Sequence, residues 1–216
     1  MKIIFKPNPG ITIKNTTIQD IGKILDLQKE TFPSMSKENS VWKQNHLESH
    51  INIFPEGQFC IDINGRIVGS SSSLIVSLKP EYADHTFSEI TGKSTFSTHN
   101  RYGDSLYGAD ISIHPKFRRL GLATLLYNAR RDLARTLNLR RIIAGGRLSN
   151  YCEYASRMSP QRYVQKVINK EIDDPVLNFQ LKNGFKVIKI LDNYIQDSRS
   201  LNHASFIEWI NQDYKK

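Results

Sequence analysis

The sequence of residues 111–141, ISIHPKFRRLGLATLLYNARRDLARTLNLRR, decides the fold prediction. At its start, Ile111 and Ile113 alternate with a serine, which is the period of a half-buried strand. Further along, apolar residues recur at the spacing of one face of an α-helix. They are Leu122, Leu125, Leu126, Ala129, Leu133 and Leu137. The stretch therefore predicts a strand, a short turn and a long amphipathic helix.

The turn between the strand and the helix is basic and contains a glycine. Arg118 and Arg119 precede Gly121, which stands where the helix is predicted to begin. The first N–H groups of a helix lack internal partners and carry partial positive charge. A glycine there lets an anion approach the backbone closely. The turn is thus a candidate cradle for a phosphate or pyrophosphate, and the alternative is an ordinary strand-to-helix turn with solvated arginines.

Two motifs carry a resemblance to a known family. Arg118, Gly121 and Ala123 fill the three defined positions of R-x-x-G-x-A, after a strand and His-Pro and before the helix. This pattern resembles the acetyl-CoA signature of the GNAT N-acetyltransferases, usually written Q/R-x-x-G-x-G/A. Residues 176–185, VLNFQLKNGF, resemble a second family element, a short helix that ends in Gly-Phe before a strand.

Further stretches resemble one branch of this family. That branch commonly forms the N-terminal module of bacterial proteins that continue into a carbon–nitrogen hydrolase (nitrilase-like) domain. The stretches are FPEGQF (54–59), SEITGKSTFSTH (88–99), SLYGADISIHP (105–115) and LNLRRIIAGGR (137–147). The resemblance runs from about residue 11 to residue 214. No hydrolase sequence follows Lys216, so we expect a stand-alone member or a truncated one.

The resemblance implies an α/β (α+β) GNAT fold. Its central sheet is mixed, mostly antiparallel and twisted, with about six or seven strands flanked by helices. Residues 1–216 are expected to form a single domain, because no linker-like composition divides the chain. Asn64-Gly65 between two β-patterned runs predicts a hairpin. Residues 147–174 are expected to be a helical insertion before the last helix, either a lid over the acceptor site or a packing appendage.

Composition favours an intracellular protein. Pro7, Pro9 and Gly10 interrupt the N-terminus before an apolar signal segment forms. No apolar run approaches the roughly 20 residues needed to span a bilayer. Two cysteines, Cys60 and Cys152, do not suggest a disulfide framework. We therefore predict a cytoplasmic location and no membrane association.

The formal net charge is +9, and the basic residues are concentrated in one region. Residues 116–141 contain eight basic side chains and one acidic side chain. Such a cluster fits nucleic acid, or a coenzyme with a pyrophosphate and a ribose phosphate. Arg131 and Arg135 fall opposite the leucines of the predicted helix and are expected to be solvated. Nucleic-acid binding is accordingly the minor hypothesis.

The coenzyme-binding residues are transferred from the family. In its members, the acetyl-CoA thioester and pantetheine lie beside the central strand, and the next strand, here 141–146, splays away to open a cleft. Gly145 and Gly146 suit close backbone approach. The implied co-substrate is acetyl-CoA, and no metal is expected. The implied binding residues are Ile111, Ser112, Ile113, Arg118, Arg119, Leu120, Gly121, Leu122, Ala123 and Thr124.

The catalytic acid departs from the family pattern. Acetyl transfer to an amine needs a deprotonated nucleophile and often an acid for the leaving thiolate. Many family members place a tyrosine four residues before the glycine of Gly-Phe, and here that position is Gln180. A glutamine side chain does not donate a proton as an acid, so the acid is not assigned by the motif.

The catalytic base is also not assigned by the motif. Several relatives place it on the central strand, near Tyr107 and Ala109 by spacing. Asp110 is adjacent, but on the opposite face unless a β-bulge shifts the register. Glu89, in the long mixed segment 79–104, is either an acceptor-site acid or a solvated carboxylate. The candidate catalytic residues are therefore Tyr107, Glu89 and Asp110.

The leading hypothesis for function is an acetyl-CoA-dependent N-acetyltransferase. It would move an acetyl group to a primary amine of a small molecule or of a peptide or lysine, by direct attack in a ternary complex. The alternative is a catalytically degenerate acyl-CoA-binding module that regulates a carbon–nitrogen hydrolase partner. A homodimer is a further hypothesis for assembly.

Overall fold

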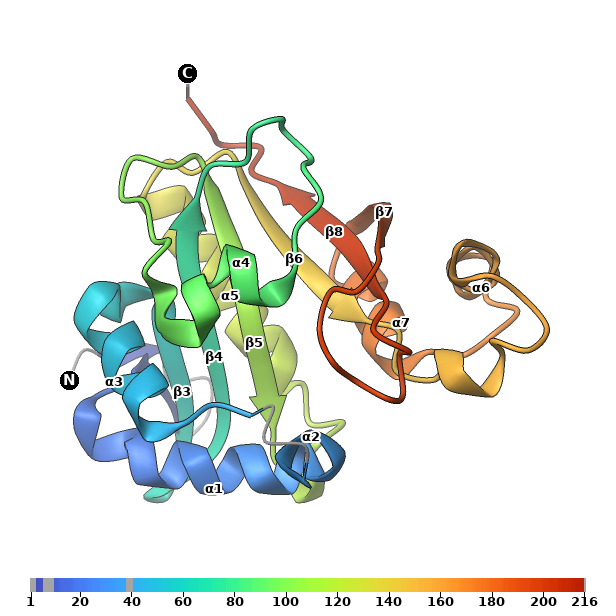
Figure 1. Cartoon of the computed structure of the whole chain (residues 1–216). Coiled ribbons are helices and arrows are strands. Elements are labelled where there is room, and N and C mark those ends of the chain that lie inside the picture. Colours follow the sequence, from blue (N-terminus) through green and yellow to red (C-terminus); the bar gives the residue numbers. More distant parts are fainter. Residues whose placement is uncertain (1–2, 6–9, 38–40, 216) are drawn as a thin grey trace.

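The computed structural model describes residues 3–5, 10–37 and 41–215, which form one sheet flanked by helices (Figure 1). Eight strands follow the order β1-β2-β3-β4-β5-β6-β8-β7. β5 and β6 are parallel, and the other neighbouring pairs are antiparallel. The predicted mixed, mostly antiparallel sheet is confirmed, and the short β1 makes eight strands of the expected six or seven. The strands are β1 (Ile3–Phe5), β2 (Ile11–Asn15), β3 (Gln58–Ile63), β4 (Arg66–Val76), β5 (Ser105–Ile113), β6 (Arg141–Arg147), β7 (Lys186–Leu191) and β8 (Ala204–Ile210).

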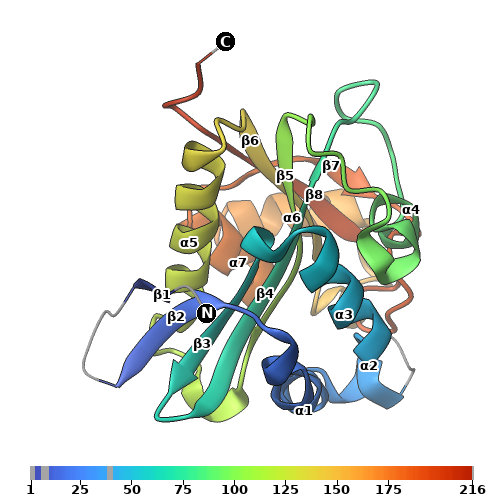
Figure 2. The same ribbon diagram turned by 90° about the vertical axis from the view of Figure 1, so that its left-hand side faces the viewer.

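Helices cover both faces of the sheet, which Figure 2 shows in the view turned by 90°. On one face lie α1 (Ile21–Thr31), α2 (Pro33–Lys37), α3 (Gln44–Ile53) and α4 (Phe87–Ile90). On the other face lie α5 (Leu122–Thr136) and α7 (Pro175–Lys182). α6 (Pro160–Ile168) lies against α7 and the edge strand β7 (Figure 1).

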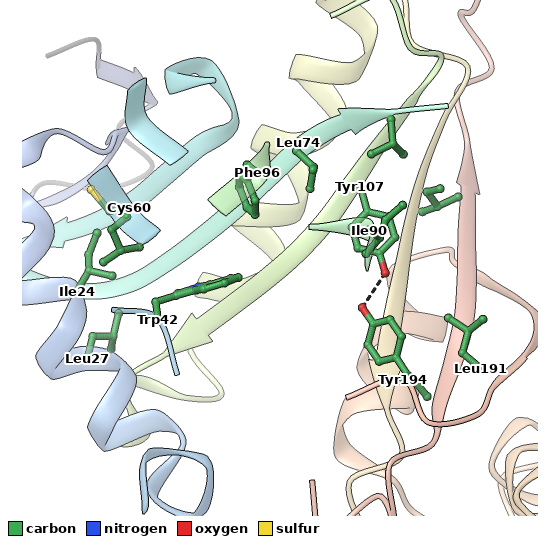
Figure 3. Packing of buried hydrophobic residues seen from close by; sticks show 14 of the residues in the cluster. Ile24, Leu27, Trp42, Cys60, Leu74, Ile90, Phe96, Tyr107, Leu191 and Tyr194 are labelled. Atoms are coloured by element: carbon green, nitrogen blue, oxygen red, sulfur yellow. Dashed lines mark hydrogen bonds between the residues drawn. The ribbon is translucent and has the colours of Figure 1, made fainter. Parts of the chain in front are cut away.

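The core has a layer on each side of the sheet. On the α1 face, Ile24 and Leu27 belong to the same buried cluster as Trp42, Leu74 and Tyr107 (Figure 3). On the α5 face, the predicted apolar stripe packs against the sheet, with Leu122, Leu126 and Ala129 buried. The stripe ends one residue early, because Leu137 follows the last residue of α5 and is 40% exposed.

The predicted hairpin at Asn64-Gly65 joins β3 to β4. Asn64 has φ 51° and Gly65 has φ 85°, so both residues adopt the left-handed conformation. A two-residue hairpin turn of the I′ type needs this conformation at both central positions, and asparagine followed by glycine adopts it most readily. The sequence signal and the backbone geometry agree.

Arg131 and Arg135 are not merely solvated, as the sequence suggested. Their guanidinium carbons lie 5.7 and 5.5 Å from the ring centroid of Trp209. Arg131 also donates a hydrogen bond to the carbonyl of Asn183, and Arg135 pairs with Asp213 at 3.1 Å. These arginines therefore attach α5 to β8 and to the C-terminal segment, and this use of their charge is structural.

The insertion before α7 is helical, as predicted. Its apolar side chains form a separate cluster with α7, made of Leu148, Tyr151, Tyr163, Val164, Val167 and Leu177. None of these six residues lines the cleft described below. The role of the insertion as a lid stays a prediction.

Asp174 connects the insertion to α7. The order Asp174-Pro175 predicts an N-cap followed by the first residue of a helix, and the carboxylate accepts the backbone N–H groups of Val176 and Leu177. It also accepts the hydroxyl of Tyr163 at 2.8 Å. Asp174 and Tyr163 are both fully buried. One side chain thus satisfies the helix end and a polar group of the insertion.

We predict that Asp174→Ala lowers the free energy of unfolding by roughly 2–4 kcal/mol. The lost cap accounts for about 1 kcal/mol, and the stranded Tyr163 hydroxyl for about 1–3 kcal/mol. Urea denaturation followed by far-ultraviolet circular dichroism measures the change. Tyr163→Phe is the matched control, since it keeps the cap and removes one hydrogen bond. An Asp174→Ala variant no less stable than Tyr163→Phe would contradict this account.

Candidate active site

The site is a cleft where β5 and β6 part. The two strands pair only from Ser105–Arg141 to Tyr107–Ile143, and β6 then continues along β8 alone. The edge of β5 that faces β6 therefore has no strand partner beyond Tyr107, so backbone polar groups on this edge face the opening. The predicted splaying of these strands is confirmed. The cavity between them has a volume of about 160 Å³.

A β-bulge in β5 turns Asp110 into this region. Ser72 pairs with Asp110 and Ser73 pairs with Gly108, so Ala109 is the extra residue on β5. Without the bulge, Tyr107 and Asp110 would project from opposite faces of the strand. With it, Asp110 lies on the α1 face, where it accepts a hydrogen bond from Gln28 of α1. The condition attached to Asp110 in the sequence analysis is met.

The Asp110 carboxylate is held by one of its oxygens. Oδ2 accepts from Gln28 Nε2 and from Ser112 Oγ, each at 2.9 Å. Burial raises the pKa of this carboxyl, whereas the hydroxyl of Ser112, the positive charge of Arg130 and the nearby indole of Trp42 oppose the rise. The Trp42 Nε1–H faces the carboxyl group, but it is not within hydrogen-bonding geometry of an acceptor.

Two glycines of β6 make room for side chains that border the cleft. A β-carbon on Gly145 would overlap the ring of Tyr194, and one on Gly146 would overlap the carboxamide of Gln180. The close approach predicted for these glycines is thus made by the protein itself. Gln180, which stands where many relatives have a tyrosine, is 6% exposed, and its Oε1 has no partner.

A chain of hydrogen bonds leads from the cleft to the surface. The hydroxyls of Tyr107 and Tyr194 are 2.6 Å apart (Figure 3), and the Tyr107 hydroxyl is 3.2 Å from His85 Nε2. Burial raises the pKa of both phenols, so they stay neutral at pH 7. His85 Nδ1 is 3.0 Å from the carbonyl of Ala83, which can only accept, so Nδ1 carries a hydrogen.

The imidazole of His85 also borders a shallow surface depression with Asp84, Glu89 and Lys189. Burial lowers the pKa of His85, the Ala83 carbonyl and the two carboxylates raise it, and Lys189 lowers it. The chain Tyr194–Tyr107–His85 therefore joins the interior cleft to an outer surface.

Glu89 is not brought to the cleft with Tyr107 and Asp110. Its carboxylate caps α4 by accepting the backbone N–H and the hydroxyl of Thr86. These bonds lower its pKa, and the side chain is exposed. Its position fits the solvated alternative from the sequence analysis.

Arg130 of α5 anchors the bulge. Its Nη2 donates to the carbonyls of Ser72, at 2.8 Å, and of Asp110, and its Nε donates to Ser73 Oγ at 3.0 Å. The side chain is 2% exposed. The guanidinium thus satisfies carbonyls on both strands at the point where the bulge disturbs their pairing.

The predicted coenzyme turn begins α5. Gly121 is the N-cap with φ 76°, and a β-carbon placed there would meet no atom within 4 Å. The N–H groups of Leu122, Ala123 and Thr124 open the helix and have no intrahelical partner. Leu120 is 65% exposed. The backbone here is open to an anion.

The remaining predicted binding residues differ in exposure. Arg118 donates to the carbonyl of Thr31, so part of its hydrogen-bonding capacity is used inside the protein. Ile111 lines the cleft, whereas Ser112 is fully buried and Ile113 is 9% exposed in the α5-face core. The side chains of Ser112 and Ile113 support the strand, and only its backbone is available to a ligand at these positions.

Sequence reasoning missed Tyr194, His85 and Arg130. Tyr194 and His85 come from loops, and Arg130 is one of several arginines on α5. The pair Gly145-Gly146 was the available signal for Tyr194, because adjacent glycines in a strand indicate that something packs closely on it. Nothing in the sequence singles out His85.

Two further observations bear on ligands and location. Among residues 3–5, 10–37 and 41–215, no group of three or more His, Cys, Asp or Glu side chains could hold a metal ion. Within the same described ranges, no helix is both long enough and apolar enough to cross a bilayer.

The site thus combines a cleft between two parting strands with a glycine-capped helix N-terminus on the following helix. The model of the GNAT acetyltransferase family matches residues 21–151, so the chain belongs to this family. A relative from Bacillus subtilis (strain 168), "Uncharacterized N-acetyltransferase YkwB", is 40% identical over 207 residues, covering 96% of this chain and 92% of the relative.

A second Bacillus subtilis relative, "Probable hydrolase YhcX", is 47% identical over 206 residues. The match covers 94% of this chain but only 39% of the relative, so the chain spans about two fifths of that protein's length. The fusion of such a module to a nitrilase-like hydrolase stays a prediction.

Solved structures share the fold at low sequence identity. The loading GNATL domain of CurA from Lyngbya majuscula has a TM-score of 0.81 at 20% identity, covering 94% of this chain and 98% of its own. The GphF GNAT-like decarboxylase in complex with isobutyryl-CoA has a TM-score of 0.80 at 19% identity, covering 93% and 99%. A putative acetyltransferase from Salmonella typhimurium, yncA, solved with its cofactor acetyl-CoA, has a TM-score of 0.57 at 15% identity, covering 96% and 97%.

We predict that Gly121→Asp weakens acetyl-CoA binding at least about tenfold, which is about 1.4 kcal/mol. The new carboxylate would stand where an anion approaches the N–H groups of α5. Isothermal calorimetry measures the affinity, and circular dichroism checks the fold. Gly121→Ala is the matched control, because it adds a β-carbon and the same backbone strain without charge. Equal affinity for Gly121→Asp and wild type would place the pyrophosphate elsewhere.

Proposed function

We propose that this chain is an acetyl-CoA-dependent N-acetyltransferase that acts on a primary amine by direct attack in a ternary complex. The observation that carries the proposal is the bulge at Ala109, which turns Asp110 toward the unpaired edge of β5. A carboxylate for an amine and free backbone groups for a thioester are thereby next to each other. Acetyl-CoA supplies the activated acetyl group when bound.

The residues around the cleft fit the coenzyme. The α5 N-terminus with Gly121 offers backbone N–H groups to the pyrophosphate, and Arg119 lies in the same basic turn. The β6-facing edge of β5 offers backbone groups to the amides of the pantetheine arm and to the carbonyl oxygen of the thioester. Both contacts use the main chain, which fits the small residues Gly121 and Ala123 at two of the three defined positions of the motif.

We assign the amine to Asp110. Its carboxylate attracts an ammonium group, which loses one proton to solvent. The neutral nitrogen then forms a bond to the acetyl carbon, and the carboxylate takes the second proton from that nitrogen. The carbon–sulfur bond breaks, and its electron pair goes to sulfur. The raised pKa of Asp110 makes it a stronger base than an exposed aspartate.

The tyrosine chain supplies the proton for sulfur in place of the tyrosine that Gln180 replaces. When His85 is protonated, Nδ1 donates to Ala83 and Nε2 donates to Tyr107. Tyr107 then donates to Tyr194, whose own hydrogen is free to point into the cleft. Each hydroxyl passes its proton along, sulfur receives one, and His85 is left neutral until solvent protonates it again.

The alternative of a degenerate binding module has less support. It offers no reason for a half-buried carboxylate with a free oxygen at the bulge, or for a chain of three titratable groups that ends at the cleft. The likeness to a decarboxylase is one of fold, and a fold alone does not set the reaction. A hydrolase partner and a homodimer stay hypotheses.

We expect Asp110→Asn to lower kcat/KM by about 10²–10⁴, the usual effect of removing a general base. Release of coenzyme A thiol with acetyl-CoA and a panel of primary amines measures it. Wild-type activity should fall as pH drops through the raised pKa of Asp110, and the variant should lose this acid limb.

Asp132→Asn, on the exposed side of α5, is the control. Glu89→Gln tests the other predicted carboxylate, for which we expect little change. Wild-type turnover by Asp110→Asn would refute the assignment.

We expect Tyr107→Phe and Tyr194→Phe each to remove the alkaline limb of the pH profile. In the wild type, the acid form of the chain is lost as pH rises through the pKa of His85, which burial has lowered. His85→Gln should show the same flattening with an intact cleft. Tyr127→Phe is the matched control, because this buried tyrosine lines the cleft outside the chain. If the control and the chain variants have the same profile, the chain does not carry the proton.

A further inference from the structure

We propose that the acceptor is a monoamine with a compact apolar or aromatic body, bound with its ammonium group at Asp110. This inference rests on the proposed function for the reaction and adds the chemical class of the acceptor. Two observations support it. Most charged side chains of the cleft are already paired within the protein, and much of the rest of the lining is apolar.

Among the described residues that line the cleft, three carry charge: Asp110, Arg130 and Arg147. Arg130 is 2% exposed and donates to two carbonyls and a hydroxyl, so it is not available to a ligand. Arg147 pairs with buried Asp197 at 2.9 Å and lies over the ring of Phe32, 5.4 Å from its centroid. Asp110 accepts two hydrogen bonds through Oδ2, and toward its carboxyl group only the indole N–H of Trp42 is directed besides these.

This charge pattern selects the ligand. A single unneutralised carboxylate favours a single cation. A second ammonium group, as in a polyamine, would find no second acid among the described lining residues. A carboxylate on the ligand, as in a free amino acid, would find both arginines already bonded. A sugar would leave several hydroxyls unpaired against apolar side chains, which is unfavourable.

Much of the remaining cleft lining is apolar or aromatic. This part comprises Phe32, Met35, Val41, Trp42, Phe87 and Ile195. The rings of Trp42 and Phe87 are 5.5 Å apart between centroids, and those of Phe87 and Tyr194 are 5.9 Å apart. These rings form a continuous surface beside the carboxylate. An aromatic body packs on it, and a cation gains from nearby ring faces.

The indole of Trp42 marks the same part of the cleft as Asp110, because its Nε1–H faces that carboxyl group. Trp42 is 7% exposed, and its Nε1–H has no acceptor. Unpaired buried donors are rare in folded proteins. A cavity of about 160 Å³ is below the roughly 300–1,000 Å³ of pockets that hold drug-sized ligands. The acceptor is therefore small.

The test compares 2-phenylethylamine with ethylamine, spermidine, glucosamine and glycine in the thiol-release assay. We expect kcat/KM for 2-phenylethylamine to exceed that for each of the other amines at least about tenfold. In an apolar pocket, a single missing methylene lowers kcat/KM by about 10–200-fold. Phe87→Ala should lower kcat/KM for 2-phenylethylamine at least about tenfold more than it lowers kcat/KM for ethylamine. Tyr102→Ala, an aromatic that is 83% exposed, is the matched control.

A binding measurement separates this inference from the proposed function. In the presence of coenzyme A, 2-phenylethylamine should raise the thermal midpoint of the wild type, and it should not do so for Asp110→Asn. That shift without thiol release would support the acceptor class and refute acetyl transfer. Thiol release that prefers spermidine, glucosamine or glycine would support acetyl transfer and overturn the acceptor class. No shift and no preference for 2-phenylethylamine would overturn the inference.

Discussion

The site depends on the hydrogen bonds that the buried guanidinium of Arg130 donates to β4 and β5. β5 must keep its pairing with β4, leave β6 after Tyr107, and accommodate Ala109 as an extra residue. The extra residue and the departure from β6 leave main-chain groups of this region outside the regular strand pairing. Arg130, which projects from α5, donates hydrogen bonds to the carbonyls of Ser72 and Asp110. Gly108 leaves the space, because a β-carbon there would be 2.9 Å from Arg130 Nη1. An arginine can do this with one planar, permanently charged group that carries five donors.

The contacts of Arg130 also explain part of an unusual run of serines in β4. Four consecutive serines, Ser70–Ser73, occupy β4 where larger residues are usual in a central strand. Ser73 accepts from Arg130 through its hydroxyl, and Ser72 through its carbonyl. The hydroxyls of Ser70 and Ser71 are buried without partners. We have no structural explanation for those two.

The sequence predicted the parts of the molecule that local chemistry determines. Asn64-Gly65, Gly121 as a helix start, and Asp174-Pro175 each specify a backbone conformation through neighbouring residues, and all three are found as predicted. The splayed strands followed from the family resemblance. The bulge could only be stated as a condition, because register depends on pairing with β4, which lies far away in the sequence.

Tyr194 and His85 reach Tyr107 from separate loops, and Arg131 and Arg135 reach Trp209 across the fold. Contacts between distant segments leave no period and no motif in the sequence, so they were not foreseen.

The position of His85 connects the cleft to a separate part of the surface through hydrogen bonds. In the proposed reaction, substrates would approach between β5 and β6, whereas the imidazole borders the outer depression beside Asp84 and Lys189. In the proposed reaction, protons therefore arrive through a route that neither substrate can block. Buffer molecules acting at this outer surface would set how quickly the chain is recharged between turnovers. Residues 84–89 and 189–192 at this surface would then influence the rate of acetyl transfer in the cleft, although the pair Tyr107 and Tyr194 separates them from it.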